Sequence, residues 1–548
     1  MTEERPGELA FRPTVGSLLG HCVSQHPDLA FVVLGDERIT YAEADQASRE
    51  LARSLISAGV GKGSRVGLLA SSSPKWVVSW LAASRVGAIA VLLNTYLKSR
   101  ELGALLRHSD VQVLLTVDEH LGHNYLDYLE ESAPELGGSG ARIRVGSHPY
   151  LRSVWVLGET SRPWAGTVDD LLALRHETSD AHLDAVEREV CPADPGVLLY
   201  TSGSTAEPKG AMHTQGSIVT QGHRIAGRRD VRRSDVIYTS MPLFWVGGFV
   251  YSLGVAMHAG ATLVFEDRFD PLSALATLER ERCTHVLGFA HVSSAMAEAP
   301  ESGGFDLSPL RRVGDKRLLS PERQRAQPEF QAQGLGMTET LGPHSLDMEG
   351  KALPPEKRGS YGPAVPGFER RIVDPETGIE ASPGEWGELL VRGHGVMQGL
   401  YKVEREATFL PGGWYPTGDR ASIDADGHIY FQGRLGTMIK TSGMNVSPRE
   451  VELVLESHAG VQMALVHGVA HPERGQDVAA LVVRAPESGV SHAGLREHAR
   501  RELSSYKVPR HLLFVDDLDE LPWIGSGKVN RAEITAVLEA QFCPGRGG

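Results

Sequence analysis

The sequence predicts an α/β protein with a large N-terminal domain and a small C-terminal domain. The chain has 548 residues, of which 41% are hydrophobic, and this length exceeds what one ordinary core supports. From Thr40 onward, amphipathic segments alternate with short apolar runs, a pattern typical of a mainly parallel sheet covered by helices. After about residue 360 the apolar runs become short and are separated by Gly, Pro and Asp, which favours a β-rich subdomain.

The N-terminal elements follow in a regular order. An amphipathic helix is expected at 41–59 and a buried strand at 65–70, followed by a second helix at 75–87 and a second buried strand at 88–93. The same pattern predicts further strands at 111–117, 154–157, 236–240, 261–265 and 285–289.

The last part of the chain has a different pattern. Short strands at 370–373, 386–392 and 427–432 form the predicted β-rich subdomain. Beyond Arg434 the sequence predicts a separate α+β domain, with helices at 448–458 and 491–503 and strands at 464–469 and 478–483. The predicted domains are therefore 1–434 and 435–548.

Composition excludes several classes of protein. The net charge of −14 disfavours a broad surface for nucleic acid. The four cysteines are scattered, so neither a disulfide framework nor a zinc site is expected, and a cytoplasmic location fits. The acidic N-terminus lacks the features of a signal peptide. Residues 241–265 carry no Asp, Glu, Lys or Arg, but Pro242 and several glycines favour a buried segment over a transmembrane one.

A loop rich in hydroxyl groups follows the apolar run at 197–199. Its glycine lets the main chain approach an anion, its hydroxyl groups donate hydrogen bonds, and its lysine supplies positive charge. An ordinary turn is the alternative, and the order differs from the P-loop G-x-x-x-x-G-K-[ST]. The predicted nucleotide-binding residues here are Thr201, Ser202, Gly203, Ser204, Thr205 and Lys209.

The order of residues 200–210 resembles the signature loop of the adenylate-forming (ANL) superfamily, which includes acyl-CoA synthetases. Ala206 stands where this family usually has glycine. The resemblance implies that the nucleotide is ATP.

The segment Gly334–Thr340 resembles the Y-G-x-T-E motif of the same superfamily, with Leu335 in place of the usual aromatic residue. The resemblance implies that Thr338 meets the α-phosphate and that Glu339 helps to hold Mg²⁺. Such a role suits the chemistry, because a hard cation that bridges phosphates takes oxygen ligands.

Two further segments resemble the ribose-binding part of the family. Tyr415–Asp419 matches the T-G-D motif, in which the carboxylate accepts hydrogen bonds from both ribose hydroxyls, and this implies that role for Asp419. The following Gly433–Arg434 pair resembles the element whose arginine contacts ribose or phosphate. A turn aspartate and a solvated loop arginine are the alternatives.

Residues 436–452 resemble the hinge region of the superfamily. Gly436 stands where relatives usually have Asp or Lys, so it permits rotation of the C-terminal lid between two half-reactions but supplies no side chain to fix either state. Lys440 is expected to assist thioester formation, with an ordinary surface lysine as the alternative.

Near the C-terminus, residues 521–531 resemble the segment that carries the adenylation lysine of the family, here Lys528. A cation between the attacking carboxylate and the phosphoryl oxygens offsets the repulsion of two anions. Taken alone, Lys528 would be an exposed turn residue.

The segment 242–248 stands where the family has an aromatic residue beside the acyl pocket. Trp245, Gly247 and Gly336 are therefore the predicted pocket residues, with core packing as the alternative for Trp245. No Asp adjoins this segment to pair the ammonium group of an amino acid, which favours an apolar acid.

These motifs together predict an ATP-dependent acyl-CoA synthetase that forms an acyl-adenylate and then a CoA thioester, with Mg²⁺ accompanying ATP. A fatty or bulky hydrophobic acid is the expected substrate. One alternative is acyl transfer to a separate carrier protein. Another is a nucleotide-binding sensor without turnover, suggested by Ala206, Gly436 and the charged residues 315–317, which replace a loop near the adenine. The oligomeric state is open, with a homodimer as one alternative.

Overall fold

The computed structural model describes residues 9–542 apart from 202–208, 289, 301, 329–330, 436–438, 442–443, 473, 487, 504 and 525–527. The chain forms two compact units. Unit 1 comprises Met1–Glu369 and Val391–Tyr415, and unit 2 comprises Arg370–Leu390 and Pro416–Gly548. The predicted boundary between residues 434 and 435 stays a prediction.

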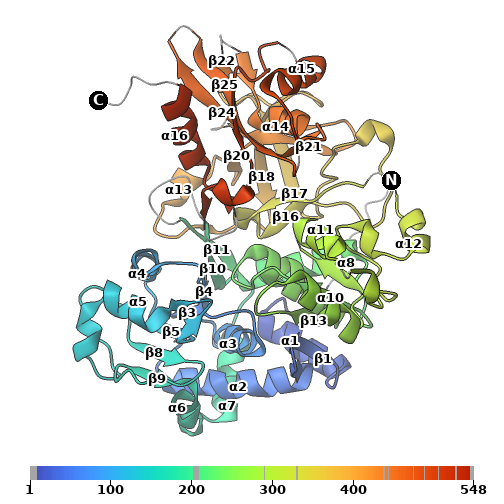
Figure 1. Ribbon diagram of the computed structural model, residues 1–548. Helices are drawn as coiled ribbons and strands as arrows, with labels where there is room; N and C mark the ends of the chain where they lie inside the picture. Colours follow the sequence, from blue (N-terminus) through green and yellow to red (C-terminus); the bar gives the residue numbers. More distant parts are fainter. Residues whose placement is uncertain are drawn as a thin grey trace. The chain divides into compact units, whose positions relative to one another are not determined.

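An eight-stranded sheet organises unit 1 (Figure 1). Its pairings from β10 outward to β9 are parallel, whereas β11 and β19 extend it by antiparallel pairing. The predicted mainly parallel sheet is thus confirmed. In spatial order the strands are β19 (Gly399–Leu400), β11 (Lys209–Thr214), β10 (Pro195–Thr201), β4 (Ile89–Leu92), β3 (Arg65–Leu69), β5 (Val113–Thr116), β8 (Ser153–Val156) and β9 (Ala165–Thr167).

A second sheet of unit 1 has five strands, parallel except for the β1–β2 hairpin. Its strands lie in the order β14 (His285–Leu287), β12 (Val236–Thr239), β13 (Thr262–Phe265), β1 (Ala30–Leu34) and β2 (Glu37–Thr40).

Local signals in the sequence explain where the first helices begin. Thr40 and Glu43 form a reciprocal capping box at the start of α2 (Tyr41–Ser57). The Ser73 side chain accepts a hydrogen bond from the main chain at the start of α3 (Pro74–Arg85), where Pro74 occupies the first turn. The other helices of unit 1 are α1 (Val15–Gln25), α4 (Ser99–His108), α5 (Tyr125–Ser132), α6 (Val168–Ala173), α7 (Asp180–Glu189), α8 (Gln215–Arg229), α9 (Val255–Ala259), α10 (Pro271–Arg280), α11 (Ala290–Glu298), α12 (Pro321–Ala326) and α13 (Arg405–Thr408).

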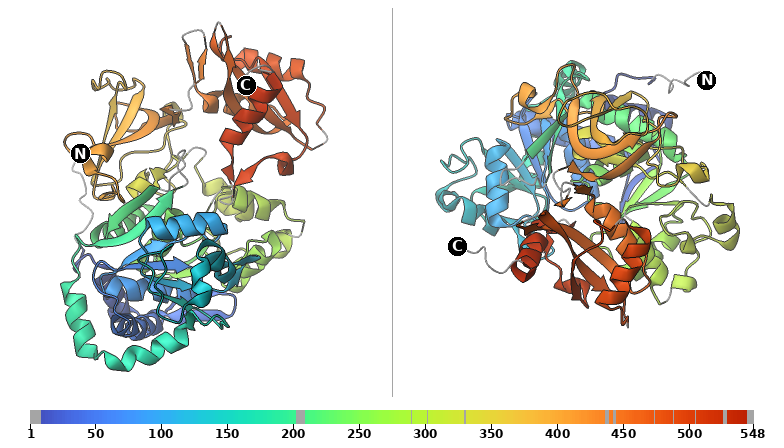
Figure 2. Two further views of the ribbon diagram at one scale, coloured as in Figure 1. Left: turned by 90° about the vertical axis from the view of Figure 1, so that its left-hand side faces the viewer. Right: turned by 90° about the horizontal axis from the view of Figure 1, so that it is seen from above.

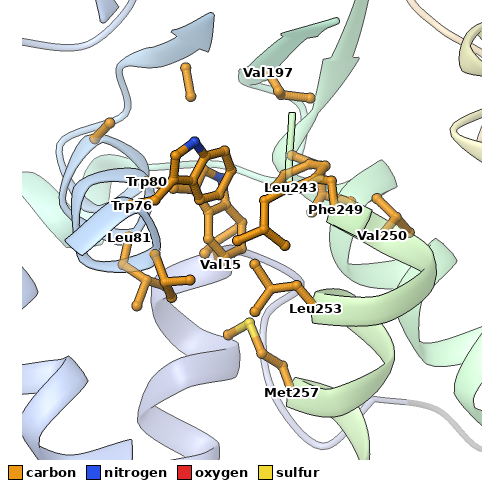
Figure 3. Close-up of a cluster of buried hydrophobic side chains, with 14 of the residues drawn as sticks. Val15, Trp76, Trp80, Leu81, Val197, Leu243, Phe249, Val250, Leu253 and Met257 are labelled. Carbon is orange, nitrogen blue, oxygen red and sulfur yellow. The ribbon is translucent and has the colours of Figure 1, made fainter. Parts of the chain in front are cut away.

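The uncharged segment 241–265 lies in the core of unit 1 (Figure 3). Its π-helical turn Gly247–Gly254 carries Phe249, whose ring centroid is 5.0 Å from that of Trp80 and 6.4 Å from that of Trp76 on α3. Edge-to-face aromatic packing of this type stabilises a core beyond the burial of area alone. Among the described residues, no helix is long and apolar enough to cross a membrane.

Unit 2 contains the predicted β-rich and α+β parts. Its first sheet has the order β17 (Phe368–Val373), β18 (Gly387–Gly393), β20 (Tyr415–Ile423) and β21 (Ile429–Arg434). The division between the units passes through the ends of β17, β18 and β20.

The second sheet of unit 2 is mostly antiparallel, with β26 added in parallel to β25. Helix α16 packs on β24, as Figure 2 shows at the red end of the colour bar. The elements are β22 (Ile439–Thr441), β23 (Met444–Val446), α14 (Pro448–Glu456), β24 (Val461–His471), β25 (Gly475–Arg484), α15 (His492–Glu502), β26 (His511–Val515), β27 (Trp523–Ile524), β28 (Lys528–Val529) and α16 (Arg531–Phe542).

Candidate active site

The hydroxyl-rich loop connects two paired strands of unit 1. Thr201 ends β10 and Lys209 begins β11, and these two residues are partners in the antiparallel ladder. The ladder therefore holds the two ends of the loop side by side, at the carboxyl end of a strand that also pairs with parallel β4. Ligands of open α/β sheets bind at this edge. Ser202, Gly203, Ser204 and Thr205 lie outside the described residues, as does the side chain of Thr201.

The predicted T-E motif forms a single 3₁₀ turn, Thr338–Thr340, between β15 (Leu335–Met337) and β16 (Gly342–Ser345). Its main chain is held from two sides. The Met397 N–H donates to the Glu339 carbonyl at 2.8 Å, and the Thr340 hydroxyl donates to the Gly342 carbonyl at 2.7 Å. These contacts fix the backbone from which the half-buried side chains of Thr338 and Glu339 project.

The chain around this turn is unusually tight. A Cβ on Gly336 would lie 2.2 Å from the Gly342 carbonyl oxygen, so only glycine fits there. Leu341, fully buried directly after the turn, has φ of +52°, a left-handed conformation that is uncommon for a side chain of this size. Such strain persists only where the surroundings impose it, and it is frequent at functional sites.

His213 supports the turn from β11, and the sequence gives no signal for it because its partner lies 125 residues away. Its Nε2 is 2.8 Å from the Thr338 carbonyl oxygen. Burial lowers the pKa of His213 to about 4, so the ring is neutral and Nε2–H donates to the carbonyl. His213 thereby links the strand after the hydroxyl-rich loop to the T-E turn.

Aromatic side chains gather around Trp245 in unit 1. The ring of Trp245 lies 5.6 Å from that of Phe244 and 6.3 Å from that of Tyr96, which follows β4. A Cβ built on Gly342 would lie 3.9 Å from Val246, so this segment adjoins the start of β16. Trp245 is half-buried.

Gly247 begins the π-helical turn at a point of close packing. A Cβ there would lie 2.7 Å from the Met241 sulfur, so this predicted pocket residue also serves the local fold.

In unit 2 the structure brings Asp419 and Arg434 together. They are partners in the β20–β21 ladder, and the Arg434 Nε lies 2.8 Å from the Asp419 carboxylate. Asp419 is almost buried, whereas the Arg434 side chain is 55% exposed. Gly418, with φ of +70°, donates its N–H to the Glu388 carboxylate at 3.1 Å and sets the bend before Asp419.

Two other predicted residues are described only by their main chain. Lys440 lies in β22 opposite Asn445, and Lys528 lies in β28 opposite Ile524, but their side chains lie outside the described part of the chain. Gly436 also lies outside it.

Two of the charged residues 315–317, Asp315 and Arg317, pair with each other, and Arg317 also pairs with Glu298. Arg317 lies 2.6 Å from the Asp315 carboxylate and holds the pKa of Asp315 below its usual value. Asp315 also caps the 3₁₀ turn Lys316–Leu318. The Asp315 carboxylate therefore stabilises the local fold, through the ion pair and through the cap of the turn.

Comparison with known protein families identifies the family of this chain. The AMP-binding enzyme family matches residues 19–401, and the AMP-binding enzyme C-terminal domain matches residues 450–528. The chain belongs to the AMP-binding enzyme family.

Relatives of this AMP-binding enzyme cover almost its whole length. It is 30% identical over 533 residues to a putative acyl-CoA synthetase, YngI, of Bacillus subtilis, covering 95% of this chain and 96% of the relative. It is 33% identical over 515 residues to a feruloyl-CoA synthase of Amycolatopsis, covering 93% and 96%.

Solved structures agree with this assignment. The anthranilate CoA ligase AuaEII in complex with anthranoyl-AMP is similar with a TM-score of 0.80 and 25% identity, covering 98% of this chain and 100% of that one. ATP-bound MatB from Rhodopseudomonas palustris shares the fold with a TM-score of 0.79. The predicted superfamily and fold class are thus confirmed, as is the predicted enzyme class, an AMP-forming acid–thiol ligase. ATP and CoA fit this family as substrates.

Proposed function

We propose that this AMP-binding enzyme activates a fatty or bulky hydrophobic carboxylic acid, aromatic acids included, and transfers the acyl group to CoA. The observation that carries the proposal is the group of aromatic rings formed by Tyr96, Phe244 and Trp245. Phe244 and Trp245 belong to a stretch, 241–265, without any Asp, Glu, Lys or Arg, and the next residue, Val246, lies against the start of β16 beside the T-E turn. Apolar side chains of this kind favour burial of a hydrophobic acyl group.

Relatives give independent support for this class of acid. Their names include a feruloyl-CoA synthase, a 4-coumarate–CoA ligase and a medium-chain acyl-CoA ligase, whose acids are aromatic or aliphatic. A sulfoacetate–CoA ligase is also among them, so membership of the family does not by itself select an apolar acid.

In the first half-reaction the acid carboxylate attacks the α-phosphorus of ATP, and pyrophosphate leaves. We assign the loop residues and Lys209 to the phosphates, Thr338 to the α-phosphate and Lys528 to the developing charge between carboxylate and phosphoryl oxygens. Asp419 and Arg434 are assigned to the ribose. In the second half-reaction the CoA thiol displaces AMP, with Lys440 assisting and Gly436 serving as the hinge.

Glu339 fits a role as the protein ligand of Mg²⁺. Its backbone is fixed by Met397, its carboxylate is half-buried, and no ion pair among the described residues engages it. Mg²⁺ is commonly bound through one or two carboxylates together with substrate phosphates, and when bound it neutralises phosphate charge. The part of the chain that the structure describes contains no group of three or more His, Cys, Asp or Glu that could hold a metal ion.

A panel of acids tests the substrate class. AMP release should require CoA, and hydrophobic aromatic, medium-chain and long-chain acids should exceed acetate and free amino acids in kcat/KM. Trp245→Ala should change the order of preference among acids while leaving the KM for ATP unchanged. Release of AMP only with an added acyl carrier protein would favour the carrier alternative, and no turnover with any acid would favour a sensor.

A further inference from the structure

A buried carboxylate in unit 2 takes no part in the reaction steps assigned above. The Glu452 side chain on α14 is fully buried, and burial of a carboxylate is costly unless cations and hydrogen-bond donors compensate it. Its Oε1 lies 2.9 Å from Nη2 of Arg531 and accepts the Val466 N–H at 3.1 Å. Its Oε2 accepts a hydrogen bond from Arg449 at 3.2 Å.

This carboxylate connects two helices that lie on opposite faces of a sheet. Val451 and Leu455 of α14 pack in one core with Val466, whereas Ile534 of α16 packs in another core with Leu465. Successive residues of a strand face opposite sides, so α14 and α16 cover different faces of β24. β24 is the last strand in the order β23–β22–β25–β24. The ion pair therefore joins the two helices around the end strand of the sheet.

Arg531 begins α16 directly after the hairpin that carries Lys528. In this hairpin Lys528 of β28 pairs with Ile524 of β27, and the Asn530 N–H donates to the Pro522 carbonyl at 2.7 Å. Because only two residues separate Lys528 from Arg531, the position of Arg531 limits the position of the Lys528 main chain.

His467 of β24 adds an uncharged contact to the same end of α16. Burial, together with the charge of Arg531, lowers the pKa of His467 to about 4, so the ring is neutral at neutral pH. The Thr535 hydroxyl donates to the Arg531 carbonyl at 2.9 Å, and His467 Nδ1 lies 2.7 Å from the same hydroxyl oxygen. The neutral ring thus contacts the first turn of α16 without supplying a second cation to Glu452.

We propose that Glu452 is a positioning residue for Lys528 and acts through Arg531. This inference rests on the proposed assignment of Lys528 to acyl-adenylate formation. The carboxylate holds the first residue of α16 beside β24 and so fixes the end of the β27–β28 hairpin. The ion pair involves neither β22, which carries Lys440, nor β23. Adenylation therefore depends on Glu452, and thioester formation does not.

Assays of the two half-reactions separate positioning from a general loss of structure. Glu452→Gln keeps the size of the side chain and an acceptor for the Val466 N–H, but it removes the charge that pairs with Arg531. We expect pyrophosphate exchange into ATP to fall about 10- to 100-fold, since a small displacement of a catalytic group has an effect of this order. The KM for ATP and thioester formation from supplied acyl-adenylate should stay near the parent values. Equal loss of both half-reactions, or unchanged pyrophosphate exchange, would overturn the proposal.

The second cation beside Glu452 provides a matched control. Arg449 lies on α14, outside the Lys528 segment, so Arg449→Gln should leave pyrophosphate exchange near that of the parent. An equal loss in Arg449→Gln and Glu452→Gln would show that the buried charge matters only for the fold.

Variants of Arg531 test the path from Glu452 to Lys528. Arg531→Gln should lower pyrophosphate exchange as much as Glu452→Gln does, Arg531→Lys should recover part of it, and the double variant Glu452→Gln/Arg531→Gln should lower it no further. Additive losses in the double variant would overturn the proposal. The Arg531 side chain is 43% exposed, so its variants carry the test where Glu452→Gln does not fold.

Amide hydrogen–deuterium exchange gives a readout that does not depend on turnover. In Glu452→Gln and Arg531→Gln, exchange should become faster in the peptide covering 528–535 and stay unchanged in the peptide covering 439–446, where Lys440 lies. Unchanged exchange in both peptides would overturn the positioning role by itself. Absence of pyrophosphate exchange in the parent protein, by contrast, would contradict the proposed function and with it the role of Lys528.

Discussion

The T-E turn of unit 1 and the Asp419–Arg434 pair of unit 2 are supported in opposite ways. At the turn, the supporting contacts go to main-chain carbonyls, from His213 and from Met397. In unit 2, the carboxylate that we assign to the ribose is itself engaged, since Arg434 lies 2.8 Å from Asp419. The contacts at the turn leave its side chains unengaged, whereas the proposed ligand-binding side chain of unit 2 also takes part in an ion pair.

Stability and chemistry are therefore separable at the turn and coupled at the ion pair. Removing a side chain from the turn should alter the reaction while the fold stays intact. Removing the Asp419 carboxylate should affect nucleotide binding and the free energy of unfolding together, because it is an almost buried charge that pairs with the exposed Arg434.

The largest effect is expected from the two lysines of unit 2. Lys528→Ala should slow acyl-adenylate formation by a factor of about 100 to 1,000, the usual cost of losing a transition-state charge contact. Thioester formation from supplied acyl-adenylate should persist. Lys440→Ala is the matched variant, with the reverse outcome expected. Equal loss of both half-reactions in Lys528→Ala, measured by pyrophosphate release and by CoA thioester formation, would contradict its assignment.

Glu339→Gln tests the turn of unit 1. The change keeps the size of the side chain and removes the charge, so adenylation should fall about 100-fold. The melting temperature should stay that of the parent, because the supports of this turn reach the main chain. Raising Mg²⁺ should recover part of the rate if Glu339 holds the metal. Glu356→Gln, an exposed glutamate, is the control; a loss of stability in Glu339→Gln would contradict the comparison.

Asp419→Asn should give a mixed result. The KM for ATP should rise about tenfold, since hydrogen bonds to charged groups contribute roughly 1.5–3 kcal/mol. The free energy of unfolding should fall by about 1 kcal/mol, discounted because Arg434 is largely exposed. Asp426→Asn, in the exposed turn of the same β20–β21 hairpin, should change neither quantity. An altered KM with an unchanged free energy of unfolding would show that the ion pair does not stabilise the fold.

His213 tests whether the turn needs its support. His213→Leu leaves the Thr338 carbonyl without this donor and should lower kcat several-fold, whereas His213→Gln retains an N–H donor and should recover part of it. Urea unfolding of both variants separates a positioning role from a general loss of stability. Identical kcat in the two variants would show that the hydrogen bond from His213 does not position the turn.

The smallest effect concerns pH. Burial lowers the pKa of His213 and His394 to about 4. Between pH 6.5 and about 4 these two histidines therefore bind more protons in the unfolded state than in the folded state. Stability should therefore be fully present above pH 6.5 and decrease as the pH falls through this window. Denaturant unfolding at pH 7.5 and 5 measures it, and His213→Gln should show a shallower decrease than the parent. An unchanged slope in that variant would show that His213 does not carry this dependence.

The sequence predicts the fold closely because periodicity reports which faces are buried. The helix at 41–59 and the strand at 65–70 reappear as α2 and β3. The sequence does not predict the supporting role of His213, because this role depends on a contact between β11 and a turn far along the chain. It also does not predict that Asp315 and Arg317 neutralise each other, because a run of charges does not indicate its own pairing.

The roles assigned to Lys209, Thr338 and Asp419 remain predictions carried by motif order. The structure places Lys209 next to Thr201 and Thr338 in a tightly supported turn, which is compatible with these roles.

If the chain forms an acyl-adenylate before it uses CoA, labelled pyrophosphate should exchange into ATP in the presence of a hydrophobic acid and in the absence of CoA. We expect exchange that depends on the acid and is lost in Lys528→Ala, followed by AMP release once CoA is added. Absence of exchange with every acid of the panel, in protein that binds ATP, would contradict this order of steps.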